Sequence, residues 1–155
     1  MSRTRWAAVA LVLAAAAATL VPLAASAFAN HRVMISERNL ATGPTTQAGT
    51  FVAAGSVNDS GTVAVTFSIQ QHGAHKGLLT GTHVLTGSNG TITVQTRAWV
   101  RPYPPPTPPR VLVEGQWRVV SGTGAYAGLH GHGKVFATGD FTTGEITIIR
   151  RGEAH

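Results

Sequence analysis

The chain has 155 residues, no cysteine, and twelve Lys and Arg against six Asp and Glu, which give a formal net charge of +6. The absence of cysteine excludes a disulfide-stapled scaffold, so the hydrophobic core alone must stabilise the fold. The basic residues are scattered apart from the neighbouring Arg150 and Arg151. This spread argues against nucleic acid as a partner and indicates solvated surface charge.

The first 29 residues have the composition of a secretory signal peptide. Arg3 and Arg5 supply a positive start, an unbroken apolar run covers residues 6–20, and small residues suited to cleavage follow. The run is shorter than the ~20 residues of a membrane span. The sequence therefore predicts a secreted protein that is not integral to the membrane, with residues 30–155 as its single domain. The alternative is an uncleaved N-terminal anchor.

Apolar and polar residues alternate along most of the remaining chain, and this period of two predicts strands. The clearest case is residues 62–70, where Val63, Val65, Phe67 and Ile69 share one face. Helical periodicity is nearly absent. The expected strands cover residues 32–38, 50–57, 62–70, 78–86, 91–101, 111–120, 133–138 and 145–151.

Turn-forming residues separate these strands at short spacing. Asn58-Asp59-Ser60-Gly61 and Gly87-Ser88-Asn89-Gly90 are typical of hairpin turns, because Asn, Asp and Gly tolerate positive φ. Residues 139–144 form a third expected turn. Residues 101–110 are rich in proline and cannot form a central strand, so they predict a stiff extended connector.

Eight antiparallel strands joined in sequence favour an all-β fold closed into a barrel, because closure removes the unpaired edges. A two-sheet β-sandwich is the alternative. In the strand over 111–120, the apolar residues Val111, Val113, Trp117 and Val119 fall on one face. We expect that face, with Trp117 at its centre, to belong to the core.

The most specific motif lies between the expected strands 111–120 and 133–138 and combines an aromatic residue with closely spaced glycines. Its members are Gly122, Gly124, Tyr126, Gly128, Gly131 and Gly133. The motif resembles the glycine-rich corner of the allene oxide cyclase and dirigent barrel proteins, and the resemblance extends over residues 111–149 and, less closely, 49–70. It implies an eight-stranded antiparallel barrel with an apolar lumen, no cofactor, and an oligomer as an open alternative, since relatives form dimers or trimers.

Two polar stripes are the candidate ligand-binding residues. One consists of Glu114, Gln116 and Arg118, and the other includes Arg97 and Trp99. If the two strands are neighbours, the stripes share a face, and in the lumen they would orient a ligand with a polar head. Glu114 and Arg118 are then the candidate acid–base groups. The alternative is that Val113 and Trp117 fill the interior while Glu114 and Arg118 pair in water.

The histidines are the candidate metal ligands of this sequence. His130 and His132 are two residues apart, so their side chains share one face of an extended segment. Neutral imidazoles at such spacing can hold Zn²⁺ or Cu²⁺. No cysteine or nearby carboxylate completes the set, so the sequence predicts no metal site.

Three functions are compatible with these observations. The first is a secreted, non-catalytic barrel that binds a small hydrophobic ligand or a partner. The second, implied by the resemblance, is a cofactor-free isomerase or cyclase, or a dirigent-like auxiliary protein. The third is a structural protein of the cell surface with a filled core. An eight-stranded barrel is near the size at which side chains alone fill the interior, so length does not decide among them.

Overall fold

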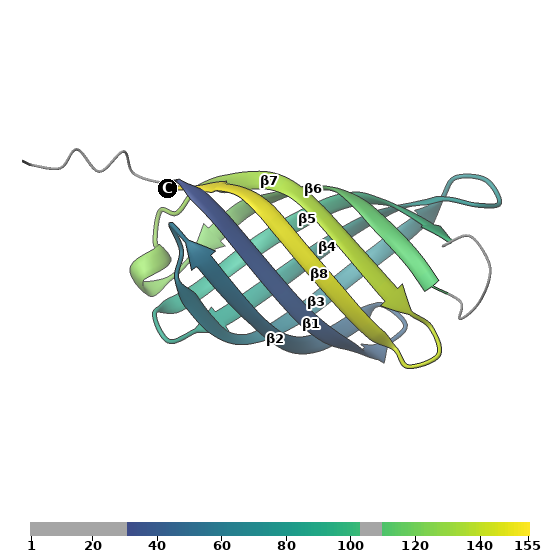
Figure 1. Ribbon diagram of the computed structural model, residues 1–155, viewed down its shortest axis with the longest axis horizontal. Coiled ribbons are helices and arrows are strands. Elements are labelled where there is room, and N and C mark those ends of the chain that lie inside the picture. Colours follow the sequence, from purple (N-terminus) through teal and green to yellow (C-terminus); the bar gives the residue numbers. More distant parts are fainter. Residues whose placement is uncertain (1–30, 103–109) are drawn as a thin grey trace, which may run out of the picture.

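The computed structural model describes residues 31–102 and 110–155, which form eight antiparallel strands (Figure 1). In chain order, the strands are β1 (Arg32–Gly43), β2 (Thr46–Gly55), β3 (Asp59–Gln71), β4 (Gly77–Gly87), β5 (Gly90–Pro102), β6 (Arg110–Gly122), β7 (Gly131–Asp140) and β8 (Glu145–Ala154). Each strand pairs with the next, and β8 pairs with β1. The expected closed barrel is confirmed. The alternative sandwich is wrong, because pairing between the first and last strands leaves no open edge.

The strand boundaries differ from expectation mainly at β1 and β2. β1 continues five residues past the expected end at Arg38. The strand expected over residues 50–57 is β2, which begins four residues earlier and ends at Gly55. Gly55 has a φ of 109°, and the Ser56 N–H donates to the Arg32 carbonyl, so the chain leaves the ladder before Val57. Val57 instead packs in the core. The two-residue turn expected at Ser88 and Asn89 joins β4 to β5 as predicted.

Two sequence predictions fall wholly or partly outside the described residues. The expected signal peptide, residues 1–29, lies outside them. So does most of the expected proline-rich connector, residues 103–109, whose flanks Arg101 and Arg110 belong to β5 and β6. Among the residues that the structure describes, no helix is long and apolar enough to cross a membrane.

The strands alternate as their sequence period requires, with one face toward the lumen and one toward solvent. The expected facing of β6 is confirmed, since Val113 and Trp117 are buried and Val119 packs against the core. Val63 and Val65, which share one face of β3, are also buried. The buried core therefore fills one half of the barrel with aliphatic and aromatic side chains, among them Val33, Ile35, Phe51, Val63, Leu85, Ile92, Val94 and Trp117.

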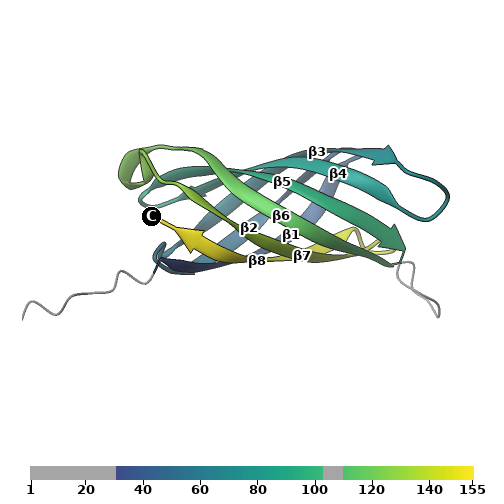
Figure 2. The ribbon, with the colours of Figure 1, turned by 90° about the horizontal axis from the view of Figure 1, so that it is seen from above.

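The glycine-rich corner closes one end of the barrel. It carries the short 3-10 helix η1 (Gly124–Tyr126), which lies beside the C-terminus in both views (Figures 1 and 2). Gly124 has a φ of 62°, and a Cβ there would come within 2.4 Å of the Asn89 carbonyl oxygen. Gly128 also has a positive φ, but its surroundings are open. At Gly124 both the positive φ and the lack of space favour glycine. At Gly128 only the positive φ does.

Asp59 anchors this corner to the barrel. The sequence placed it in a turn, but it begins β3 and is buried. The Tyr126 O–H donates to its Oδ2 at 2.8 Å, and backbone N–H groups of Ser60, Ser88 and Asn89 also donate to the carboxylate. The hydrogen bond from Tyr126, followed by those from the backbone, holds the pKa of Asp59 well below its usual range. An ionised carboxylate thus ties three loops together at the closed end.

Candidate functional site

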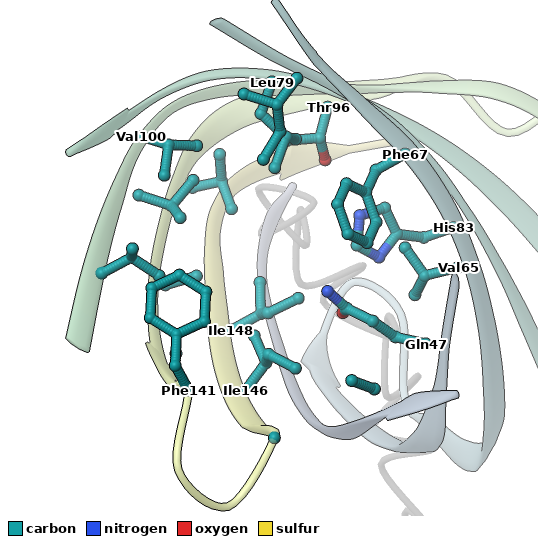
Figure 3. Close-up of a pocket in the computed structure, with 18 of the residues that line it drawn as sticks. Gln47, Val65, Phe67, Leu79, His83, Thr96, Val100, Phe141, Ile146 and Ile148 are labelled. Carbon is teal, nitrogen blue, oxygen red and sulfur yellow. The ribbon is translucent and has the colours of Figure 1, made fainter. Parts of the chain in front are cut away.

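The other end of the barrel contains a pocket of about 360 Å³. It lies where the β1–β2 and β7–β8 turns meet, opposite η1 (Figures 1 and 3). Its volume falls within the range of small-molecule sites, roughly 300–1,000 Å³. The lumen is therefore filled by side chains at the corner end and hollow at this end.

The wall of the pocket is apolar. Alternate residues of the surrounding strands point inward, as expected from the period of two. Phe141 lies in the β7–β8 turn at the mouth, with 69% of its surface exposed. The labelled side chains in Figure 3 surround the open space from several strands. The main apolar lining residues are Val65, Phe67, Leu79, Val100, Val113, Val135, Ala137, Ile146 and Ile148.

A buried ion pair lies at the floor of the pocket. Arg150 of β8 and Glu37 of β1 both have 0% of their side-chain surface exposed, and Arg150 Nη1 donates to Glu37 Oε1. Arg150 Nη2 donates across the lumen to Thr96 Oγ1 on β5, at 3.2 Å. The Arg150–Arg151 pair was expected to be solvated surface charge. That is wrong for Arg150, which follows Ile146 and Ile148 on the inward face of its strand.

His83 of β4 joins Arg150, Glu37 and Thr96 in a buried polar layer at the floor of the pocket. Its Nδ1 lies 3.0 Å from Glu37 Oε2, and the ring is buried with 4% of the side chain exposed. Asn39 Nδ2 donates to the same oxygen at 3.2 Å. Glu37 thus receives hydrogen bonds from three side chains, and three members of the layer, His83, Thr96 and Arg150, line the pocket.

Burial and charge act against each other in this layer. Burial raises the pKa of Glu37, but the Arg150 charge and the hydrogen bonds from His83 and Asn39 outweigh it, so the pKa falls from 4.5 to about 2. Burial lowers the pKa of His83, and the Arg150 charge lowers it further. The folded protein therefore holds Glu37 as a carboxylate and His83 as a neutral imidazole around neutral pH.

These pKa shifts predict a stability that falls in acid in two stages. As the pH falls below about 6.5, the unfolded chain takes up a proton on His83 before the folded chain does. Below pH 4.5 the unfolded chain also protonates Glu37, which stays ionised in the fold until about pH 2. Each proton contributes up to about 1.4 kcal/mol per pH unit. His83→Gln should flatten the stage that begins near pH 6.5. Urea unfolding across this range measures it, and an unchanged slope would contradict it.

The candidate ligand-binding residues from the sequence lie on the outside of the barrel. β5 and β6 are neighbours, and the two stripes share a face, with Trp99 opposite Glu114 and Arg97 opposite Gln116. That face is the outer one, as the alternative with Val113 and Trp117 inside expected, so the stripes do not line the lumen. The cause is their phase, because they alternate with the inward residues Val113 and Trp117. Ligand binding by these residues stays a prediction.

The candidate acid–base pair also has other partners than expected. Glu114 binds Arg101, and both side chains are about half exposed. Arg118 donates to Gln95 Oε1 through Nε and Nη2. The pairing of Glu114 with Arg118 in water, expected as the alternative, is therefore replaced by pairs across the β5–β6 ladder, where cross-strand neighbours are closer than residues four apart on one strand.

His130 and His132 are both exposed near the closed end. Within residues 31–102 and 110–155, no three His, Cys, Asp or Glu side chains come together in a way that could hold a metal ion. The imidazole of His83 is hydrogen-bonded to Glu37.

The polar layer escaped sequence reasoning although a signal for it exists. Glu37 follows Val33 and Ile35 at intervals of two, and Thr96 follows Ile92 and Val94 in the same way. A polar side chain in phase with an apolar face points into the lumen, where it needs a partner. That signal identifies each inward polar residue separately, but it does not predict which of these side chains contact one another.

Comparison of the chain with models of protein families, with curated proteins and with solved structures finds no match.

Proposed function

We propose that this protein is an exported, non-catalytic barrel that binds a small hydrophobic ligand in its lumen pocket. The observation that carries the proposal is the pocket of about 360 Å³, with apolar walls and a polar floor. Ligand sites are commonly lined by apolar side chains with a few polar groups that orient the ligand. A purely structural protein of the cell surface needs no such space, so the pocket favours binding over a filled scaffold.

We also propose a relationship to the allene oxide cyclase and dirigent barrels. It is supported by the eight-stranded closed barrel and by a glycine corner whose Tyr126 packs in the core. The buried polar groups at the floor of the pocket, Glu37, Asn39, His83, Thr96 and Arg150, lie on β1, β4, β5 and β8. The relationship would make a cofactor-free isomerase or cyclase the second candidate function.

One observation favours that second candidate. Glu37 orients His83, and a histidine held by a carboxylate is a common form of general base. His83 lines the pocket, so a bound molecule would come within reach of it. Chromatography of the ligand recovered from the protein distinguishes the two functions, because binding returns it unchanged and catalysis does not.

The binding function predicts that filling the pocket abolishes uptake of an apolar probe. Ala137 is buried and lines the pocket, so Ala137→Phe should place a ring in the space that a ligand needs. We expect the affinity for the fluorescent probe N-phenylnaphthylamine to fall by roughly ten-fold or more, equivalent to about 1.4 kcal/mol. Fluorescence titration of the mature protein measures it.

The matched control is the neighbouring residue. Thr138 lies on the outer face of the same strand and is exposed, so Thr138→Phe adds a ring of the same size outside the barrel. It should bind the probe as the unmodified protein does. Equal binding by both variants, or no binding by the unmodified protein, would contradict the proposed function.

A further inference from the structure

The polar groups at the pocket floor differ in what they can offer a ligand. Arg150 has 0% of its side chain exposed, and its Nη1 and Nη2 are engaged by Glu37 and Thr96. Its Nε has no hydrogen-bond partner among the described residues but is sealed from solvent. The cation is therefore already paired, and the other two side chains of the floor that line the pocket are His83 and Thr96.

His83 presents an acceptor to the pocket. Glu37 is ionised and can only accept, so the proton of the short contact must lie on Nδ1 of His83. In a neutral imidazole the other nitrogen, Nε2, is then unprotonated and accepts hydrogen bonds. Among the described residues no hydrogen bond reaches Nε2, and the side chain lines the pocket.

Thr96 presents a donor beside it. Its Oγ1 accepts from Arg150, whose guanidinium can only donate, so the threonine proton points elsewhere. Thr96 pairs with Gly81, two residues from His83 on the neighbouring strand β4. Diagonal neighbours on one face of a sheet lie about 7–8 Å apart, within reach of an aromatic side chain such as that of His83. Figure 3 shows both side chains directed into the same space.

We propose that the pocket selects an apolar molecule with a neutral hydroxyl head, such as an aliphatic alcohol, over the corresponding carboxylate. This inference rests on the proposed binding function. A hydroxyl accepts from Thr96 and donates to His83, which satisfies both groups. A carboxylate cannot donate, faces the lone pair of His83 Nε2, and brings a second negative charge toward Glu37 in a desolvated site. Arg150, the cation at the floor, is already paired with Glu37.

Competition among three ligands of matched chain length tests the selectivity. Decanol, decyl methyl ether and decanoate each displace N-phenylnaphthylamine from the mature protein at pH 7.5 if they enter the pocket. We expect decanol to bind roughly five-fold more tightly than the ether, which has no donor, since one hydrogen bond contributes about that factor. Decanoate should bind at least about ten-fold more weakly than decanol.

A variant pair assigns the preference to His83. His83→Phe removes the acceptor, so the preference for decanol over the ether should shrink to within about two-fold. His132→Phe makes the same substitution on the outer face and should leave the preference unchanged. If His83→Phe does not fold, the relative affinities of the three ligands for the unmodified protein still test the selectivity.

The outcomes separate this inference from the function on which it rests. Displacement of the probe by decanoate at the same or lower concentration than decanol overturns the selectivity while leaving lumen binding intact. Equal affinity for decanol and decyl methyl ether also overturns the selectivity and leaves lumen binding intact. Failure of the probe to bind at all overturns the binding function, and the selectivity with it.

Discussion

Arg150→Met is expected to destabilise the barrel by about 3–5 kcal/mol, because it leaves the Glu37 carboxylate buried without its cation. His83 and Asn39 would still donate to Glu37, but neither carries a positive charge in the folded state at neutral pH. The pKa of Glu37 should rise, since the Arg150 charge is the largest of the effects that lower it. Urea unfolding of the variant and the unmodified protein measures the free-energy difference.

Arg151→Met is the matched control. Arg151 is the next residue along β8, points outward and is exposed, so its replacement should change the free energy of unfolding by less than about 0.5 kcal/mol. A double variant, Glu37→Leu with Arg150→Met, removes both charges and should be less destabilised than Arg150→Met alone. Similar stability of Arg150→Met and Arg151→Met would show that the buried ion pair contributes nothing.

The strands were predictable because each one carries its own evidence. A period of two with β-branched residues marks β3, and the Gly87–Gly90 segment marks the turn between β4 and β5. Closure followed from the number of strands, since an open sheet would expose two edges. The facing of β6 followed from Val113 and Trp117, which share one phase of the alternation.

The pocket and its floor were not predictable in the same way. Glu37 and Arg150 are 113 residues apart, and they meet only because β1 and β8 close the barrel in one particular register. His83 reaches Glu37 across the lumen, a contact that no local pattern encodes. The hollow itself depends on the summed size of many inward side chains. Sequence reasoning therefore chose polar residues that were close along the strands, and those lie outside.

Trp117→Ala is expected to cost about 3–5 kcal/mol, because it removes the largest buried ring of the filled half of the barrel. Only 2% of the Trp117 surface is exposed, and its indole N–H donates to the Arg151 carbonyl at 3.4 Å. The ring lies opposite Gly133 of β7 and Thr96 of β5, both much smaller than the indole. A cost of this size is a large part of the stability of an ordinary domain.

Trp99→Ala tests whether burial, and not loss of any indole, causes that effect. Trp99 is 44% exposed on the outer face, with the Lys76 ammonium 5.0 Å from its ring centre and His72 at its edge. Such exposed contacts contribute about 0.5–1 kcal/mol, so Trp99→Ala should unfold at nearly the urea concentration of the unmodified protein. If both variants unfold alike, Trp117 does not hold the core together, and the inward facing of β6 would have to be reconsidered. A large difference locates the stability of the barrel in the half that the pocket leaves filled.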